Sequence, residues 1–474
     1  MRTATLVALA AAWLLGSLNA NAQSSVTGAA GVPALPTDLA DFVAYAETDL
    51  PAHFRAGTPS GDLISARDST PADNPITNAG ATLGRVLFYD PRLSHNNGTA
   101  CASCHQQQHG FTDPEPKSTG FEGEQTDRNS MALGNSRYYS NGAFFWDERS
   151  PTLEHQVLQP IQSPVEMGVT DLGDLEEKLA ATDFYPKLFE QAFGTPEVTS
   201  ERMSLAMSQF VRSMVSYSSK YDEAFTGRGP PDFAGTLNVS EERGHQLFAG
   251  ACAGCHGTNA QVALATHNIG LDPVSDEELG TDEGAGDGEF KVPSLRNVAV
   301  RGTYMHDGRF ESLEEVVRFY STQIQDNPNL DRVLTLPNGR PVRFNFTDQE
   351  VDDLVAFLGT LTDDVLLTSD LFSNPFVTLP GDYNDDGVVD ASDYIVWRST
   401  QGTPGDLLAD GNADGLVDSA DYDLWRANYG ATWESLTLAG DVAAATAAPE
   451  PATLTLLAAA SWFWRRRPRK LPAG

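Results

Sequence analysis

Apolar side chains recur at helical spacing through much of the chain between about residues 74 and 365. One stretch has its apolar side chains at i, i+3, i+4 and i+7, the spacing of one helix face: Met203, Ala206, Met207, Phe210, Val211 and Met214. We interpret these methionines as core residues and not as metal ligands. Thr347-x-x-Glu350 is a capping box that opens a second amphipathic stretch. No convincing alternating pattern appears, so we expect an all-α pair of domains.

The first 73 residues do not follow this pattern. Residues 1–22 contain Arg2, an apolar run from Leu6 to Leu18 and an Ala20-Asn21-Ala22 cleavage pattern, which together predict a signal peptide. Residues 23–73 are rich in Ala, Pro, Gly, Ser and Asp, and we expect an irregular extension there. The protein is therefore predicted to be exported, to the periplasm or cell envelope. No internal stretch approaches the roughly 20 apolar residues of a membrane span.

All four cysteines of the 474-residue chain lie in two short motifs, Cys101-Ala102-Ser103-Cys104-His105 and Cys252-Ala253-Gly254-Cys255-His256. C-x-x-C-H is typical of c-type haem attachment, in which the thiols bond to the porphyrin and the histidine ligates iron. The alternatives are a redox C-x-x-C and a zinc site with four ligands drawn from both motifs. Two complete copies in an exported chain favour two covalent haems, held by Cys101, Cys104, His105, Cys252, Cys255 and His256.

The two halves of this helical region repeat each other. Gly84-x-x-Leu87-Phe88 precedes the first motif, and Gly244-x-x-Leu247-Phe248 precedes the second. Further along, Trp146-Asp147-Glu148-Arg149 is echoed by His306-Asp307-Gly308-Arg309, an offset of 160 positions from 146 to 306. Motifs that recur in the same order along both halves indicate homologous units. We therefore expect two haem domains packed face to face.

The net charge of the chain limits the classes of partner that it can bind. Lys and Arg number 31 against 65 Asp and Glu, a formal net charge of −34. Nucleic acid is therefore an unsuitable partner, whereas a basic redox protein of the cytochrome c or cupredoxin type is a suitable electron donor. The acidity is equally consistent with a role in solubility or with a salty habitat.

An acidic repeat follows residue 370. Oxygen-bearing side chains recur with a period of 28, from 382 to 410, at positions 1, 3, 5, 9 and 12 of two loops: Asp382, Asn384, Asp386, Asp390 and Asp393, then Asp410, Asn412, Asp414, Asp418 and Asp421. With Gly387 and Gly415 at position 6, these loops resemble EF-hand calcium loops. Asp at position 12 resembles the dockerin type I repeat, which implies two calcium ions and a cohesin-like partner. The alternative is a disordered acidic tail.

The end of the chain has a pattern of its own. Pro449-Glu450-Pro451 precedes an apolar segment, Ala452 to Trp464, and three arginines follow that segment. This arrangement resembles a PEP-CTERM sorting signal, which implies a sorting protease and a transient membrane tether. Thirteen apolar residues, 452 to 464, are short for a stable span.

Four segments resemble the bacterial di-haem cytochrome c peroxidases, a family that includes the MauG-type enzymes. They are Phe145-Trp146-Asp147, Pro164-Val165-Glu166-Met167, Pro293-Ser294-Leu295-Arg296-Asn297 and Tyr304-Met305-His306-Asp307-Gly308. The resemblance covers roughly residues 74–365. It implies that hydrogen peroxide is reduced at the N-terminal haem with electrons passed on by the C-terminal haem.

The resemblance also implies roles for single residues. Gln156 and Glu166 match the family's distal pair, in which Glu166 would shuttle a proton and Gln156 would hold the peroxide. Trp146 matches the tryptophan that relays electrons between the haems, although a core role would suit the same spacing. Asn129 and the main-chain carbonyls of Arg301 and Thr303 match the ligands of an inter-domain calcium ion.

Two departures point towards MauG-type members. Ser312-x-x-Glu315 is a capping box for a helix that places Tyr320 on its buried face, where conventional peroxidases carry a methionine haem ligand. Met305 is the alternative ligand. Conventional members also place a blocking histidine in the loop after the first motif, whereas residues 120–124 contain none and His109 lies only four positions past His105. We therefore expect a first haem that is five-coordinate at rest.

Three functions agree with these patterns. The favoured one is an exported di-haem cytochrome c peroxidase, with MauG-type oxidation of a protein side chain as the alternative. The third is a non-catalytic electron-transfer or envelope-docking cytochrome, which would need neither Gln156 nor Glu166. The predicted fold is all-α: a signal peptide (1–22), an extension (23–73), an N-terminal peroxidatic cytochrome c domain (74–230), a C-terminal electron-transfer domain (236–368), a dockerin-like EF-hand-related calcium module (380–432) and a sorting signal (449–470).

Overall fold

The computed structural model describes most of the chain between residues 62 and 432. The described ranges are 62–225, 230–263, 265–273, 282–377, 379–384, 388–402, 409–412 and 416–432, with short pieces at 32–33, 35, 44–46 and 50–55. The predicted signal peptide (1–22) and sorting signal (449–470) lie outside these residues. No helix in the described ranges is long and apolar enough to cross a membrane.

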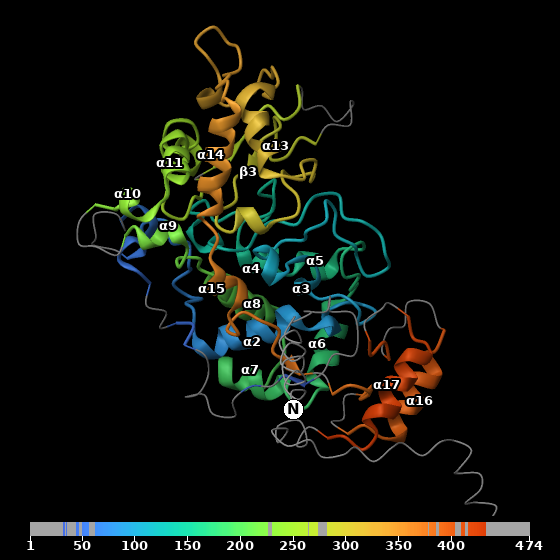
Figure 1. The fold of residues 1–474 in the computed structure, drawn as a ribbon. Helices are drawn as coiled ribbons and strands as arrows, with labels where there is room; N and C mark the ends of the chain where they lie inside the picture. The colour runs from blue at the N-terminus through green and yellow to red at the C-terminus, as the bar shows by residue number, and fades with distance from the viewer. Residues whose placement is uncertain are drawn as a thin grey trace, which may run out of the picture.

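The N-terminal haem domain is built on two helices, α2 (Asn78–Tyr89) and α8 (Ser200–Ser213), that pack along each other (Figure 1). The Thr77 side chain caps α2 by accepting a hydrogen bond from the Gly80 amide, 3.0 Å away. Gly84 allows the helices to approach closely, because a Cβ there would lie 2.0 Å from the Ala206 carbonyl oxygen. Shorter helices complete the domain: α3 (Cys101–Cys104), α4 (Leu153–Gln156), α5 (Gln159–Gln162), α6 (Leu172–Ala180) and α7 (Tyr185–Phe193).

The C-terminal haem domain repeats this construction with α11 (Val239–Ala251) packed on α14 (Asp348–Gly359). Gly244 occupies the place of Gly84, and a Cβ there would lie 1.9 Å from the Asp353 carbonyl oxygen. The predicted capping box at Thr347 is present. The other helices of this region are α9 (Lys220–Glu223), α10 (Phe233–Thr236), α12 (Ala253–His256) and α13 (Leu313–Arg318). The Gly-x-x-Leu-Phe repeat in the sequence therefore corresponds to the same helix crossing in both domains, α2 on α8 and α11 on α14.

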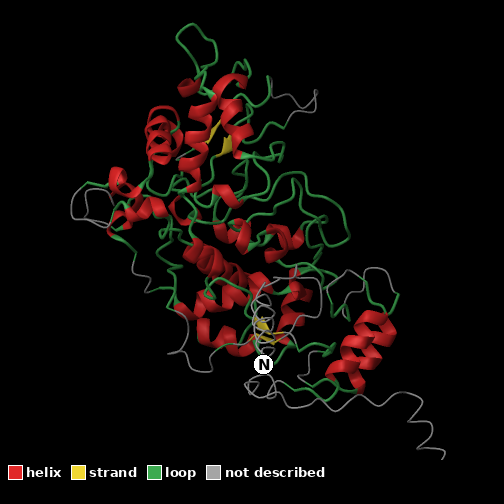
Figure 2. Cartoon of the chain, viewed as in Figure 1, coloured by secondary structure: helices red, strands yellow, loops and turns green. Residues whose placement is uncertain are grey.

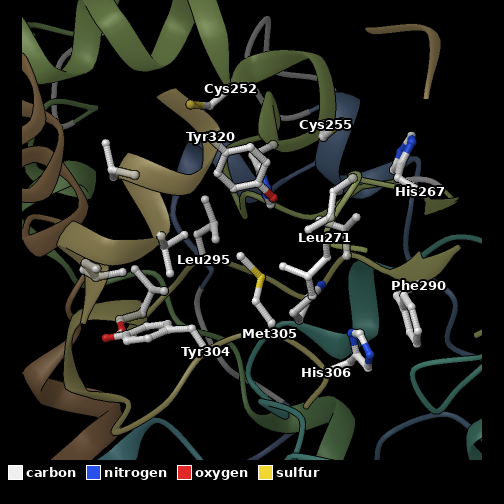
Figure 3. A pocket seen from close by; sticks show the side chains of 18 of the residues that line it. Cys252, Cys255, His267, Leu271, Phe290, Leu295, Tyr304, Met305, His306 and Tyr320 are labelled. Atoms are coloured by element: carbon white, nitrogen blue, oxygen red, sulfur yellow. Dashed lines mark hydrogen bonds between the residues drawn. The ribbon is translucent and has the colours of Figure 1, made fainter. Parts of the chain in front are cut away.

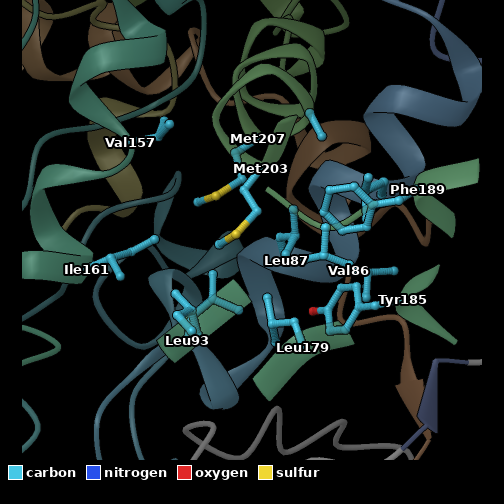
Figure 4. Close-up of a cluster of buried hydrophobic side chains, with 14 of the residues drawn as sticks. Val86, Leu87, Leu93, Val157, Ile161, Leu179, Tyr185, Phe189, Met203 and Met207 are labelled. Carbon is cyan, nitrogen blue, oxygen red and sulfur yellow. The ribbon is translucent and has the colours of Figure 1, made fainter. Parts of the chain in front are cut away.

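The methionine stripe of α8 lies in the core. Met203 and Met207 project into the middle of a buried cluster, near Ile161 and Leu87 (Figure 4), and Met214 lies in a neighbouring cluster. None of these three side chains is more than 2% exposed. The interpretation of these methionines as core residues is confirmed.

Very little of the part of the chain that the structure describes is β-sheet (Figure 2). The described residues form two antiparallel ribbons, β1 (Val32–Pro33) with β4 (Phe376–Val377) and β2 (Thr266–His267) with β3 (Phe290–Lys291). Strands of two residues are too short to produce an alternating pattern, so the sequence did not predict them. The mostly helical character agrees with the prediction.

The segment after α14 returns to the N-terminal domain. It forms α15 (Asp364–Thr368), and the Gln107 side chain donates hydrogen bonds of 2.9 Å to the carbonyl oxygens of Leu366 and Ser369. The Tyr89 hydroxyl donates to the Phe372 carbonyl at 2.5 Å. The C-terminal domain is thereby fastened across the domain that carries the first haem motif.

A buried ionic cluster lies behind the second motif. The Arg296 guanidinium donates to the Asp222 carboxylate, and the His53 ring nitrogen Nε2 lies 2.7 Å from the same carboxylate. All three side chains are buried. His53 belongs to the short helical turn Ala52–Phe54, so the described part of the N-terminal extension is anchored to the C-terminal domain.

Beyond residue 379, two helices of the predicted calcium module pack against each other, α16 (Ala391–Thr400) and α17 (Ser419–Asn428). Each repeat donates an indole hydrogen bond to the other: the Trp397 N–H donates to the Asp418 carbonyl at 2.7 Å, and the Trp425 N–H donates to the Asp390 carbonyl at 2.8 Å. Asp386 and Asp414 lie outside the described residues, so calcium binding there stays a prediction.

Candidate haem sites

The second C-x-x-C-H motif opens onto an apolar cavity of the C-terminal domain (Figure 3). Cys252, Cys255 and His256 form one wall, and Tyr320 and Met305 project into the same space. His256 ends α12, and its ring nitrogen Nδ1 lies 3.4 Å from the Gln261 carbonyl oxygen. This contact leaves Nε2 available as an iron ligand.

The first motif has the same proximal arrangement. The His105 ring nitrogen Nδ1 lies 3.0 Å from the Phe111 carbonyl oxygen and 3.2 Å from the Ser130 hydroxyl. Phe111 and Gln261, which supply the two carbonyls, both have left-handed backbones, with φ of 60° and 48°. Such strain in two non-glycine residues at matching places indicates a functional constraint. Each turn orients a histidine for a metal.

The cysteine thiols suit covalent haem attachment better than they suit a redox-active pair or a zinc site. All four cysteines are free, and burial is the largest effect that raises the pKa of Cys101, Cys104 and Cys252 to about 12 each. A redox-active cysteine requires a lowered pKa instead. Among the residues that the structure describes, no three His, Cys, Asp or Glu side chains are arranged to hold a metal, which argues against a zinc site shared by the motifs.

Glu166 lies next to the first motif. One buried cluster joins Cys101 to Val157 and Met167, the neighbours of Gln156 and Glu166 in sequence. The Glu166 carboxylate also acts electrostatically on the Cys101 and Cys104 thiols. Burial raises the pKa of Glu166, nearby Arg149 opposes this shift, and Asp127 adds to it. A half-buried carboxyl group with a raised pKa holds its proton more readily than an ordinary glutamate, which suits a proton-transfer role.

The loop after the first motif lies directly on the Glu166 segment. The Phe121 amide donates to the Glu166 carbonyl at 3.1 Å, and a Cβ on Gly120 would lie 1.7 Å from the Val165 carbonyl oxygen. This glycine therefore permits a backbone contact that a side chain would prevent. His109 faces the other domain, with its Nδ1 3.0 Å from the Val300 carbonyl oxygen.

Trp146 belongs to the N-terminal domain but lines the cavity of the second. Its indole N–H donates to the Asn129 carbonyl oxygen at 2.8 Å, and its ring meets the His306 ring edge-on at 6.5 Å between centroids. His306 in turn stacks on Phe290 at 3.7 Å. An aromatic row therefore begins in one domain and continues into the other.

Tyr320 faces the second motif, but the helix beneath it is not regular. α13 ends at Arg318, and Phe319–Gln323 form a π-helical turn, of a kind that often marks functional sites. The predicted capping box is incomplete, because Ser312 accepts from the Glu315 amide while the Glu315 carboxylate accepts from the Glu311 amide at 2.8 Å. Burial and the nearby Cys252 and Cys255 thiols raise the pKa of Tyr320.

The predicted inter-domain calcium ligands lie partly together. The Asn129 side-chain amide donates to the Thr303 hydroxyl at 2.9 Å and to the Glu115 carbonyl at 3.1 Å. The Arg301 carbonyl accepts a hydrogen bond from the Tyr304 hydroxyl at 3.2 Å. Calcium at this position stays a prediction.

Two residues at the second site were not singled out from the sequence. His267 lies beside Cys255 and is 2.5 Å from the Asp331 carboxylate; hydrogen bonding to Cys255, then to Asp331, raises its pKa to about 9. Lys291 is buried at the junction of the domains. Each depends on partners distant in sequence, and the only available signal was the position of Lys291 two residues before Pro293, the start of a family motif.

Comparisons with known proteins agree with this geometry. The sequence model of the di-haem cytochrome c peroxidase family matches residues 78–229, and a cytochrome c model matches residues 241–362. The chain is 31% identical to the methylamine utilization protein MauG of Methylophilus methylotrophus, over 65% of this chain and 90% of that protein. It is 34% identical to the cytochrome c551 peroxidase of Nitrosomonas europaea, over 60% of this chain and 80% of the relative.

A solved structure gives the same result. A MauG-like protein associated with microbial copper homeostasis matches with a TM-score of 0.58 and 31% identity, covering 69% of this chain and 99% of that one. Two c-type haem domains with free thiols, oriented histidines and a shared scaffold account for both the sequence and the structural matches. The chain belongs to the di-haem cytochrome c peroxidase family.

Proposed function

We propose that the protein reduces hydrogen peroxide at the first haem site with electrons delivered through the second. The observation that carries this proposal is Glu166, a half-buried carboxyl group with a raised pKa beside the first attachment motif. A haem bound there would supply the iron that binds peroxide and accepts electrons. The protein's part is to hold the substrate and to move its proton.

Glu166 is suited to the proton transfer. Cleavage of the O–O bond is assisted when the proton on one peroxide oxygen is moved to the other. In the described part of the chain no side chain is hydrogen bonded to the Glu166 carboxylate, so both of its oxygens are available. Gln156, half-buried at the end of α4, offers an amide donor and acceptor that would hold the peroxide.

Trp146 is the proposed relay between the sites. Its indole N–H is bonded to a main-chain carbonyl, which is a very weak base. The indole therefore keeps its proton when an electron is removed and regains its original state when one returns. A relay that moves only electrons avoids the delay of a proton transfer.

Tyr320 favours a second candidate, MauG-type oxidation of a protein side chain. An oxygen ligand to the second haem favours oxidised states more than a methionine thioether does. The loop over residues 120–124, which lies against the Glu166 segment, contains no histidine, so the first site would be open to peroxide at rest. Both features suit an enzyme that is active without prior reduction, whichever substrate supplies the electrons.

Several accompanying features also belong to the proposal. The protein would be exported to the periplasm or envelope and would receive electrons from a small, basic redox protein, in keeping with its net charge of −34. Calcium would bind between the haem domains and in the two C-terminal loops, and the dockerin-like module would dock a cohesin-like partner.

Substitution of Glu166 tests the peroxidase proposal. We expect Glu166→Gln to lower peroxide turnover by about 10²- to 10⁴-fold, the usual contribution of a proton-transfer group, with haem content unchanged. Asp326→Asn, 160 positions further on in the other domain, is the matched control and should retain full turnover. Equal turnover in the wild type and Glu166→Gln would rule out the assigned role.

A further inference from the structure

Lys291 is held directly against the Trp146 segment. It is the second residue of β3, its side chain is 4% exposed, and its main-chain N–H donates to the Trp146 carbonyl at 2.8 Å. Lys291 also lines the second haem cavity. A charge on this side chain would therefore lie at the junction of the relay and the second site.

The ammonium group has unusual surroundings. It lies 4.0 Å from the centre of the Tyr139 ring and 4.1 Å from that of Phe144, and its hydrogen bond is to the Ala143 carbonyl, at 3.2 Å. Over the described ranges, no carboxylate comes within ion-pair distance of it. Glu148 attracts it from further away, but that carboxylate is already bonded to the Tyr139 hydroxyl and, at 2.6 Å, to the Asn141 amide.

A lysine held in this way can lose its charge near neutral pH. Burial lowers the pKa of Lys291 to about 7, partly opposed by Glu148, while the two aromatic faces favour the charged form. The charge is thus present at lower pH and absent at higher pH. Tyr139 and Glu148 act on it from the segment before Trp146, and other titratable or charged side chains line the same cavity as Lys291: His267, Asp272, Asp282, Arg301 and His306.

We propose that Lys291 is a positioning residue that sets the reduction potential of the second haem site and of Trp146 through the charge of its ammonium group. This inference rests on the proposed electron relay. A nearby positive charge disfavours the oxidised state of both groups, so it raises their potentials. Loss of the proton would lower both potentials and ease the removal of an electron from Trp146. Relay through Trp146 would therefore be favoured at higher pH.

Two substitutions fix the two charge states. Lys291→Met removes the charge and keeps an apolar side chain of similar length. In this variant the reduction potential of the second haem should stay at its lower value at every pH. Lys291→Arg keeps the charge, because a guanidinium does not lose its proton in proteins. In Lys291→Arg the reduction potential of the second haem should stay at its higher value at every pH. The wild type should change from the upper limit to the lower one as pH rises through neutrality.

The test is a spectroelectrochemical titration of the second haem in the full-length holoprotein, over a pH series on both sides of neutrality. Lys178→Met is the matched control, because Lys178 is a half-buried lysine whose hydrogen bonds also go to main-chain carbonyls, those of Arg92 and Ser94, in the N-terminal domain. It should leave the wild-type pH dependence unchanged. Glu148→Gln should shift the transition to lower pH, because it removes the opposing carboxylate.

An identical pH dependence in the wild type, Lys291→Met and Lys291→Arg would overturn the inference. Haem content and circular dichroism identify a variant that fails to fold, and in that case Lys291→Arg and Glu148→Gln decide the outcome. Peroxide turnover of Trp146→Phe is measured separately. A normal turnover there would refute the relay, while the potentials would still report on Lys291.

Discussion

The two haem sites share a scaffold and differ on the side where a substrate or a sixth ligand would bind. Both have a glycine-mediated helix crossing and a histidine bonded to the carbonyl of a left-handed residue. Where the first site has Gln156, the second has Val316, 160 positions further on, in the cavity wall. The second site therefore lacks the amide side chain that, in our proposal, holds the peroxide at the first site.

A second pair of residues extends the comparison. Phe145 and Met305 occupy equivalent left-handed positions, with φ of 68° and 74°, and each is followed by an aromatic ring, Trp146 or His306. Those two rings meet at the domain interface. The duplicated turn therefore supplies both rings of the contact between the sites, Trp146 and His306. The residue before each ring differs, and only the second site has a thioether there, that of Met305. Differences in a few side chains on one scaffold give the two sites different chemistry.

The largest expected effect concerns two arginines that each precede an asparagine, Arg128 and Arg296. Asp222→Ala would leave Arg296 buried without its carboxylate, and we expect a loss of about 3–5 kcal/mol in the free energy of unfolding. Arg128→Met removes more exposed pairs with Asp147 and Asp282, and should change it by at most about 1 kcal/mol. Denaturant unfolding of the holoproteins measures both, and equal losses would contradict the difference in burial.

Tyr320→Met would make the second site resemble a conventional peroxidase. We expect its reduction potential to rise, by on the order of 0.1 V within the ~0.8 V that axial ligands span. Met305→Leu is the companion variant, because both side chains project into the cavity. A large shift in Met305→Leu with none in Tyr320→Met would assign the ligand to Met305.

The shared scaffold makes a symmetrical prediction. Gly84→Ala and Gly244→Ala each place a methyl group within 2.0 Å of a main-chain carbonyl oxygen on the facing helix. The helices must separate, and each variant should lose about 1–3 kcal/mol of stability by overpacking. Thermal unfolding followed at each haem's absorbance would measure the losses. A loss in one domain only would show that the crossings are not equivalent.

The smallest expected effect is a shift in pH dependence. Because burial raises the pKa of Glu166, its carboxylate form is present above that pKa and is lost on acidification at a higher pH than for an ordinary glutamate, about 4.3. The rate of the peroxide step should therefore begin to fall above the usual carboxyl range. Rapid-mixing rates across pH test this, and a rate that is constant down to the usual carboxyl range would contradict it.

The scaffold was readable from the sequence because its signals are local. The C-x-x-C-H motifs, the Gly-x-x-Leu-Phe repeats and the helical stripe around Met207 each lie within a few residues, and the structure has all three. Tyr320 was placed on the buried side correctly, but its π-helical turn was not predicted, since one extra residue in a helix leaves little trace in the apolar pattern.

The electrostatic setting could not be read in the same way. The ammonium group of Lys291 lies over two rings about 150 positions earlier in the chain, and the ring of His267 is bonded to the Asp331 carboxylate. Such partners are defined by the packing of the two domains and not by spacing. Gln156 and Glu166 were identified only through resemblance to the family, because a single polar side chain in a short helix or turn has no distinctive pattern.

The most direct test of the account is a stopped-flow visible spectrum of the fully oxidised holoprotein mixed with hydrogen peroxide. We predict an immediate change in the Soret band for the wild type and for Asp326→Asn, and a greatly slowed change for Glu166→Gln. A wild-type spectrum that stays unchanged until the protein is partly reduced would contradict an open first site, and an equally fast change in Glu166→Gln would contradict its proton-transfer role.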